Sequence, residues 1–126
     1  MANENDENIH LTGGWGKGYI SNGAFAEYLV YSLQANSWSK GPYLKVARHL
    51  HGSTILNEKL YVFAGMDETD QCINSLEVLE LNAVSKAWTL LALEIIPARA
   101  CPLICPINEK ELLIMGGTYK AEEEGG

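Results

Sequence analysis

Short hydrophobic runs separated by polar turns occupy most of this chain. Between residues 48 and 91 the hydrophobic runs cover residues 53–56, 60–63, 76–81 and 88–91. Residues that favour β-strands fill the first two runs. The segments 76–81 and 87–93 are rich in Leu and Ala, which favour helix, but both are shorter than the roughly 10–12 residues at which length indicates a helix. We therefore predict four short strands joined by turns, which form an antiparallel meander.

The same landmarks return along the chain with a period of about 51 residues. Asn57-Glu58-Lys59 returns as Asn108-Glu109-Lys110, Arg48 as Arg99, Trp38 as Trp88, and the small pair Gly13-Gly14 as Ala64-Gly65 and as Gly116-Gly117. A period of this length predicts stacked supersecondary units, each of which buries its hydrophobic face on a neighbour. Laid over the whole chain, it predicts nine strands: three in a first unit, four in the second and two in a third. The strands outside the second unit fall at residues 9–12, 27–33, around Trp38, 101–107 and 112–115.

Three motifs follow one another in the complete second unit. They are Arg48-x-x-His51-x-Ser53, then Leu60-Tyr61-Val62-Phe63-Ala64-Gly65, then Glu77-Val78-x-x-Leu81 seven residues before Trp88. In this order they resemble a kelch repeat, whose hallmarks are an Arg-led first strand, a double glycine that ends the second strand, and a Tyr seven residues before a Trp. The first unit keeps the double glycine and the spacing from Tyr31 to Trp38, and the third keeps Arg99 and the double glycine. Two residues of the second unit depart from the pattern: Ala64 replaces the first glycine of the pair, and Leu81 replaces the Tyr. A WD-type repeat fits less well, because its period is shorter and no Trp-Asp pair occurs.

The resemblance implies an all-β fold, a partial kelch-type β-propeller with four-stranded antiparallel blades and an incomplete ring. Propellers close with typically 4–8 blades. We therefore expect a fragment of a longer protein, or a ring completed by other chains. The expected domains are an acidic tail at 1–8, kelch repeats at 9–117 (partial 9–47, full 48–98, partial 99–117), and an acidic, Gly-containing tail at 118–126.

Two prolines and two tryptophans test that arrangement. Pro102 and Pro106 fall in the first strand of the third unit, and proline belongs on strand edges because it lacks a donor for the ladder. The resemblance to kelch propellers implies that the first strand of each blade lies innermost and leaves a free edge toward the channel. Both prolines fit at that edge. Trp38 and Trp88 share one position in the repeat, so we expect both to pack between blades.

Charge and composition narrow the class of partner and the compartment. The net charge is −7, which disfavours a nucleic-acid or anionic-membrane surface. Six of the sixteen acids lie in the two tails, which we interpret as solvated, although the Glu run 122–124 could also contact a basic partner. The polar segment 1–8 is no signal peptide, and 90–107 contains charges and prolines that do not suit a membrane span. Cytoplasm is the expected location.

Candidate chemistry is sparse. Cys72, Cys101 and Cys105 are interpreted as free thiols, since residues four apart in a strand lie beyond disulfide reach. His49 and His51 on one strand face could hold a metal with Cys101 or Cys105, but the spacing matches no closed zinc pattern. No catalytic constellation is visible, and the Gly-rich segment 13–18 lacks the features of a phosphate loop. We expect neither a cofactor nor a metal.

Candidate partner-binding residues come from two groups of loops. In kelch propellers the loops after the double glycine, and the approach to the first strand, line the channel mouth used for binding. The matching positions here are Trp15, Lys17, Tyr19, Met66, Asp67, Glu68, Arg48, His49 and Arg99. The loop 66–74 is also longer than a tight turn requires, and long loops often carry function. For the two arginines, hydrogen bonding to carbonyls between blades is an equal alternative.

These observations predict a protein-protein interaction module, part of a kelch propeller that presents loops to a protein partner. Further kelch blades, from a longer chain or from other subunits, are expected partners as well. One alternative is a propeller enzyme, an oxidase or a sugar-handling enzyme. A copper site at its channel mouth would need Tyr, His and Cys side chains to converge, and Tyr19 and His49 are the only candidates for it. Another is a purely architectural subunit of a large complex. Fold by itself does not decide among these functions.

Overall fold

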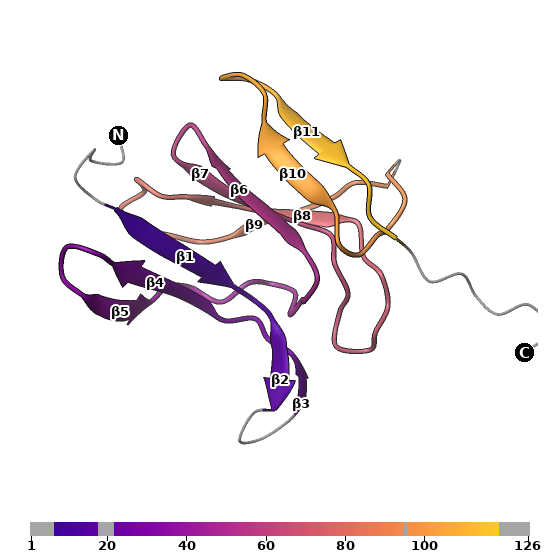
Figure 1. Ribbon diagram of the computed structural model, residues 1–126, viewed down its shortest axis with the longest axis horizontal. Helices are drawn as coiled ribbons and strands as arrows, with labels where there is room; N and C mark the ends of the chain where they lie inside the picture. The colour runs from indigo at the N-terminus through magenta and orange to yellow at the C-terminus, as the bar shows by residue number, and fades with distance from the viewer. Residues whose placement is uncertain (1–6, 18–21, 95, 119–126) are drawn as a thin grey trace, which may run out of the picture.

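The computed structural model describes residues 7–17, 22–94 and 96–118, and every regular element in these ranges is a β-strand (Figure 1). The predicted all-β class is confirmed. The strands are β1 (Asn8–Thr12), β2 (Trp15–Lys17), β3 (Asn22–Ala24), β4 (Tyr28–Ser32), β5 (Ser37–Lys40), β6 (Gly52–Leu56), β7 (Lys59–Phe63), β8 (Ser75–Glu80), β9 (Thr89–Ala92), β10 (Leu103–Pro106) and β11 (Leu112–Met115).

The second unit forms the predicted four-stranded antiparallel blade, in the order β6-β7-β8-β9. Asn57 and Glu58 form the tight turn between β6 and β7, and both have positive φ angles (50° and 61°), as the preferred two-residue hairpin turn requires. Val78 pairs with Tyr61 on one side and with Thr89 on the other. The strand interpretation of residues 76–81 is therefore confirmed, although their Leu content also favours helix.

The flanking units are incomplete blades, as the repeat predicted. The first consists of three strands in the order β1-β4-β5, and the third of the pair β10-β11. Figure 1 shows the three sheets side by side, with the complete blade in the middle. All nine predicted strands are present, and together they form part of a propeller and not a closed ring.

One hairpin was not predicted. β2 and β3 pair antiparallel, with Trp15 opposite Ala24 and Gly16 opposite Gly23, and they project beyond the first blade (Figure 1). Each strand has three residues and a glycine at its centre, so neither shows the hydrophobic alternation that signals a strand.

Backbone pairing of the described chain begins at Asn8, in β1, and extends to Thr118, which exchanges two backbone hydrogen bonds with Ala100.

The larger core lies between the first and second blades. Its buried members are Tyr28, Leu44, Leu60, Val62, Leu79 and Trp88. The ring of Trp88 meets that of Tyr28 edge-on, with centroids 5.5 Å apart, and its indole N–H donates to the carbonyl of Pro42 at 2.9 Å. A smaller core of Phe63, Ala64 and Ile104 joins the second blade to the third. Trp88 therefore packs between blades, as predicted.

Trp38 does not pack between blades among the described residues, and the prediction for it was wrong. It lies on β5 with 57% of its surface exposed, although it occupies the same position in the repeat as Trp88. Its face of the first blade, which includes Ile9 and Leu11, is covered by no other sheet among the described residues. Trp88 is buried because a preceding blade covers it, and the described residues supply no blade before the first.

Backbone hydrogen bonds join each blade to the next. The amide of Gly14 donates to the carbonyl of Arg48 at 2.8 Å, and the amide of Gly65 donates to the carbonyl of Arg99 at the same distance. Gly65 has a φ of +94°, and a Cβ there would lie 2.4 Å from the carbonyl oxygen of His49. The small pair of the repeat thus lets two backbones approach closely.

One of the two prolines lies in an edge strand, as expected. Pro106 ends β10, which is an edge strand of its sheet, and Pro102 falls one residue before that strand begins. The expectation that both prolines lie within the strand is therefore correct for Pro106 only.

Candidate functional site

Loops from two blades meet at one end of the molecule. The β2–β3 hairpin extends from the first blade, and the segment between β7 and β8 extends from the second in the same direction (Figure 1). His49 lies just before β6, between these two loops. We call Trp15, His49, Met66 and residues 67–72 the loop-end surface.

Trp15 and His49 are the aromatic part of the loop-end surface. Trp15 is 59% exposed, and its ring centroid lies 6.5 Å from that of His49. His49 and Met66 exchange two backbone hydrogen bonds, of 3.0 Å and 2.8 Å. Three of the predicted residues therefore come together, and backbone pairing holds two of them in place.

Asp67 organises the acidic loop that follows. Its carboxylate accepts hydrogen bonds from the amide of Thr69 (2.8 Å), the hydroxyl of Thr69 (2.7 Å) and the amide of Gln71 (3.1 Å). Burial acts to raise the pKa of Asp67, but these hydrogen bonds outweigh it and hold the pKa below its usual value. Glu68 is exposed beside this turn. The loop is thus an ordered acidic projection.

Asp70 was not among the predicted residues. Its carboxylate lies 3.7 Å from Nε2 of His49, which forms an ion pair when the histidine is protonated. Asp70 has a positive φ of 60°, which the turn closed by Asp67 imposes. The sequence Asp67-x-Thr69 is typical of a side-chain-closed turn and could have indicated that Asp70 folds back toward His49.

His51 lies beneath the surface, where its Nε2 is 2.9 Å from the hydroxyl oxygen of Thr12. Burial, and after it the positive charge of Arg48, lower the pKa of His51 to about 4, so the ring is neutral at pH 7. Nε of Arg48, Nε2 of His49 and Nδ1 of His51 are buried without a hydrogen-bond partner among the described residues. Such atoms favour a bound group that can satisfy them.

Arg48 does not reach the loop-end surface. Its side chain is 0% exposed, and its guanidinium donates to Glu77 at 2.7 Å, to the carbonyls of Ala64 and Ser75, and to the hydroxyl of Ser75. Arg48 therefore has a structural role, but its guanidinium bonds within the second blade and not between blades, as the alternative had it.

Arg99 repeats part of this arrangement in the third blade. Its guanidinium donates to the carbonyl of Gly116 at 3.1 Å and to that of Pro97 at 3.2 Å. Arg99 is partly exposed, and the described residues place no carboxylate against it. Because its guanidinium contacts Pro97 and Gly116, Arg99 does not join Trp15 in the loop-end surface.

The remaining predicted residues are Lys17 and Tyr19. The backbone of Lys17 ends β2, opposite Asn22, while Tyr19 lies outside the described residues. Within residues 7–17, 22–94 and 96–118, no group of three or more His, Cys, Asp or Glu side chains is arranged to hold a metal. In the same ranges, no helix is long and apolar enough to cross a membrane. The three cysteines are free thiols.

Comparison with known proteins agrees with this architecture. The family model described as the kelch motif matches residues 47–92. Alpha-scruin and beta-scruin of Limulus polyphemus are 25% and 28% identical to the chain, in alignments of 119 residues that cover 92% of the chain. The chain spans only 12% and 13% of the length of these relatives.

Proposed function

We propose that this chain, whose residues 47–92 match the kelch motif, is a protein-interaction module, part of a kelch propeller that presents its loop-end surface to another protein. The observation that carries the proposal is the exposed ring of Trp15 beside His49 and the ordered acidic loop. Exposed aromatic side chains are frequent anchors of protein interfaces. The Asp67 turn and the His49–Met66 pairing keep this surface in shape before a partner arrives, which lowers the entropic cost of binding.

The chemistry of the surface indicates the chemistry of its partner. Trp15 and Met66 offer apolar area, while Asp67, Glu68 and Asp70 supply negative charge beside them. A matching protein surface would carry an apolar side chain flanked by Lys or Arg. Lys17, Tyr19 and Arg99 stay within the proposal as residues that could widen the contact.

The test begins with the purified chain immobilised as bait. Proteins retained from a cell extract would be identified, purified and titrated against the chain by calorimetry. Trp15→Ala should weaken binding by about tenfold or more, as expected for an anchor, and Glu68→Lys should weaken it further at low salt. Val84→Ser, which changes an exposed side chain in the β8–β9 connection, serves as the control. A partner that binds wild type and Trp15→Ala equally would contradict the loop-end surface as the site.

An architectural role is a second candidate, and the exposed Trp38 face favours it. We propose that further kelch blades, from a longer chain or from other subunits, cover Trp38, Ile9 and Leu11, which are all at least half exposed. The repeat limits 9–47, 48–98 and 99–117, with tails on either side, remain our proposed domain division. We also propose a cytoplasmic location, because the cysteines are free thiols and disulfides are rare in that compartment.

A further inference from the structure

The outer edge of the second blade is formed by β9, and this edge is open. β9 pairs with β8 on one side, and no strand among the described residues pairs with its other side. At the opposite edge of the same sheet, β6 contacts β10 of the third blade, and the two buried clusters lie between neighbouring blades. Blades therefore meet through their faces and inner strands, so a further blade would leave the β9 edge free.

The sequence of β9 gives this edge no protection. Its four residues, 89–92, are all exposed, and they include neither a charge nor a proline, the residues that commonly keep an edge from pairing with another chain. Leu90 and Leu91 are 41% and 44% exposed. β5, the outer strand of the first blade, carries two serines and Lys40 instead. The apolar edge is therefore a property of the second blade and not of the repeat.

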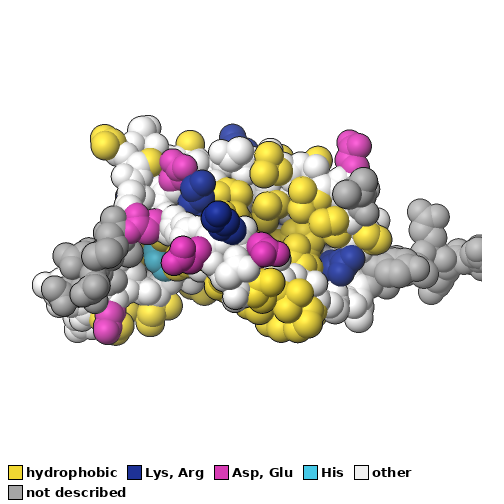
Figure 2. Space-filling model, turned by 90° about the horizontal axis from the view of Figure 1, so that it is seen from above, with side chains coloured by type: hydrophobic (Ala, Val, Ile, Leu, Met, Phe, Trp, Pro, Cys, Tyr) yellow, Lys and Arg dark blue, Asp and Glu magenta, His cyan; other side chains and the backbone are white. Residues whose placement is uncertain are grey.

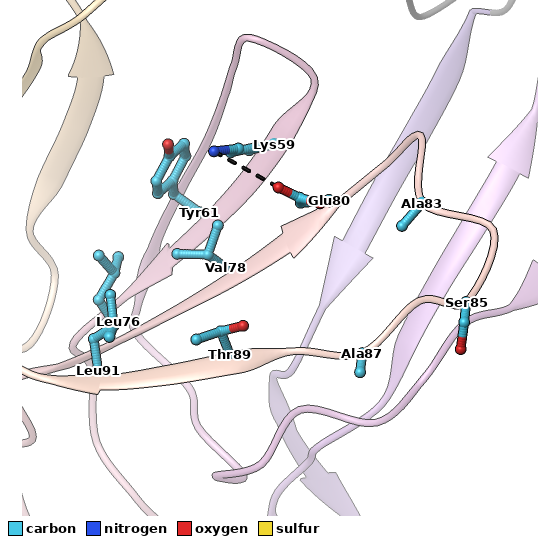
Figure 3. Close-up of a pocket in the computed structure, with 10 residues that line it drawn as sticks. All are labelled: Lys59, Tyr61, Leu76, Val78, Glu80, Ala83, Ser85, Ala87, Thr89 and Leu91. Atoms are coloured by element: carbon cyan, nitrogen blue, oxygen red, sulfur yellow. Dashed lines mark ion pairs between the residues drawn. The ribbon is translucent and has the colours of Figure 1, made fainter.

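One face of β9 borders a hollow of about 430 Å³ (Figure 3). Thr89 and Leu91 line the hollow from β9, while Tyr61, Leu76 and Val78 line it from β7 and β8. Seen from above, hydrophobic side chains of the molecule also gather in one broad area beside charged ones (Figure 2). An apolar centre with a polar rim is the usual composition of a contact between proteins. A strand added to β9 would extend the apolar face of this blade.

Two opposite charges flank β9 at equal distances from its centre. Lys86 lies four residues before Leu90 and Glu94 lies four residues after it, and both charged side chains are exposed. An antiparallel pair centred on Leu90 places the partner's Leu90 opposite it and the partner's Glu94 opposite Lys86. The two-fold axis repeats the Lys–Glu pair at the other end. The segment is therefore complementary to itself in charge.

We propose that β9 pairs antiparallel with β9 of a second copy of this chain, in the register centred on Leu90. The two complete blades then form one sheet of eight strands. Alternate peptide groups of β9 point away from β8, and this register uses them in either case, because the hydrogen-bonded pair forms at Leu90 or between Thr89 and the partner's Leu91. The dimer depends neither on the loop-end surface nor on what covers the Trp38 face.

Charge reversal tests this register by sedimentation equilibrium of the full 126-residue chain. Every protein in the series carries Leu11→Lys and Trp38→Ser, which reduce association through the exposed face of the first blade. This parent chain should show a reversible monomer–dimer equilibrium. Lys86→Glu and Glu94→Lys should each weaken the dimer by about tenfold in about 0.1 M salt, because each change places like charges opposite one another at both ends.

Mixtures of variants separate this contact from general repulsion. An equimolar mixture of Lys86→Glu and Glu94→Lys should recover the stability of the parent dimer, which also shows that both variants are folded. The chain that carries both reversals should recover it as well. Glu94→Lys lowers the net negative charge, so general repulsion alone would strengthen its association. Lys110→Glu, the matched reversal in the exposed β10–β11 turn, and Trp15→Ala should leave the dimer unchanged.

Three outcomes would overturn the proposal. The first is a parent chain that stays monomeric up to about 100 μM, which would leave the β9 edge to a strand of another protein. The second is a Lys86→Glu or Glu94→Lys chain that dimerises as the parent does. The third is a mixture of these two variants that dimerises no better than either variant alone.

Discussion

Arg48 and Glu77 form an ion pair in which neither side chain is exposed to solvent. Glu77 also accepts hydrogen bonds from the amides of Lys45 (2.6 Å) and Val46 (3.2 Å), so it orders the segment that leads into the second blade. Burial lowers the pKa of Arg48, and the charge of Glu77 works against that shift. A buried pair adds little net stability over apolar residues, but loss of one partner leaves an unpaired buried charge.

Glu77→Gln should therefore lower the free energy of unfolding by about 3–5 kcal/mol, measured by urea denaturation. Replacement of both partners, Arg48→Met with Glu77→Leu, should cost less than the two single changes added together. Glu80→Gln is the matched control, because the Lys59–Glu80 pair is exposed at 3.7 Å and should be worth less than about 1 kcal/mol. Equal losses for Glu77→Gln and Glu80→Gln would contradict the structural role of Arg48.

The two repeat-related tryptophans should respond differently to truncation. Trp88 is 3% exposed, so Trp88→Ala should lower the free energy of unfolding by about 3–5 kcal/mol, the range for truncation of a buried aromatic side chain. Trp38→Ala removes a side chain that is more than half exposed and should cost less than about 1 kcal/mol. Chemical denaturation of both variants is the measurement. A small loss for Trp88→Ala would mean that the first two blades do not pack as described.

His51 should make stability depend on pH. Its folded pKa of about 4 lies below the ordinary value of 6.5, so the folded state takes up a proton less readily than the unfolded chain. The contribution of neutral His51 to the free energy of unfolding is fully present above about pH 6.5. It is lost as the pH falls toward 4, and the total loss is about 3 kcal/mol at most. His51→Asn should unfold with a smaller change in urea midpoint between pH 7 and pH 4.5 than wild type. An unchanged pH response would place His51 in solvent.

At the scale of elements, the repeat made most of the fold predictable from the sequence. Each blade is a local meander, and the period supplied the position of every strand that the repeat contains. The β2–β3 hairpin lies outside that pattern, because its residues pair through backbone groups around two glycines and leave no hydrophobic signature. Trp38 was misplaced for another reason: burial depends on a neighbouring blade, and a periodic pattern does not say whether one is present.

The candidate site was predictable in part. Trp15, His49, Met66 and Asp67 were all chosen from loop position, and the structure brings them to one end of the molecule. Arg48 shares that sequence neighbourhood but turns inward, because Glu77 lies buried beside it on a strand 29 positions away. Pairing between residues so far apart cannot be inferred from a single sequence without a motif that fixes both.

Glycine substitutions test the close approach that ends the second strand of each unit. Gly65→Ala should cost about 3 kcal/mol, because the residue has a positive φ and the new Cβ would meet the carbonyl of His49. Gly116→Ala, at a φ of +66° with nothing within 4 Å of the new Cβ, should cost about 1–2 kcal/mol. Thermal and urea unfolding of the two variants give the comparison. A harmless Gly65→Ala would mean that the blades are further apart than described.

At the scale of the whole molecule, one complete blade between two partial blades leaves apolar surface at both ends of the row. Ile9, Leu11 and Trp38 are exposed on the first blade, and Leu113 and Met115 on the third. β5 and β11 also present unpaired strand edges among the described residues. Surfaces of this kind promote association between molecules.

The isolated chain should therefore sediment as oligomers or aggregates at low micromolar concentration. Leu11→Lys combined with Trp38→Ser should lower the average mass, because it places charge and polarity on the first exposed face. Val84→Ser, in an exposed connection, should leave the mass unchanged. A sharply monomeric wild-type species that unfolds cooperatively would show that the chain closes its own core.

The joint between blades is made by backbone groups on both sides: a glycine amide and an arginine carbonyl. A joint of this kind makes no demand on side-chain chemistry, provided that the donor residue tolerates its conformation. The residue before the donor has latitude as well, because Ala64, which precedes the donor Gly65, adopts nearly the φ of Gly13 and Gly116 without being a glycine. A gene segment that encodes one unit could therefore be copied in tandem and its product would dock at once. The loops of the copy would then be free to change, and a new binding surface could arise without any alteration to the frame that carries it.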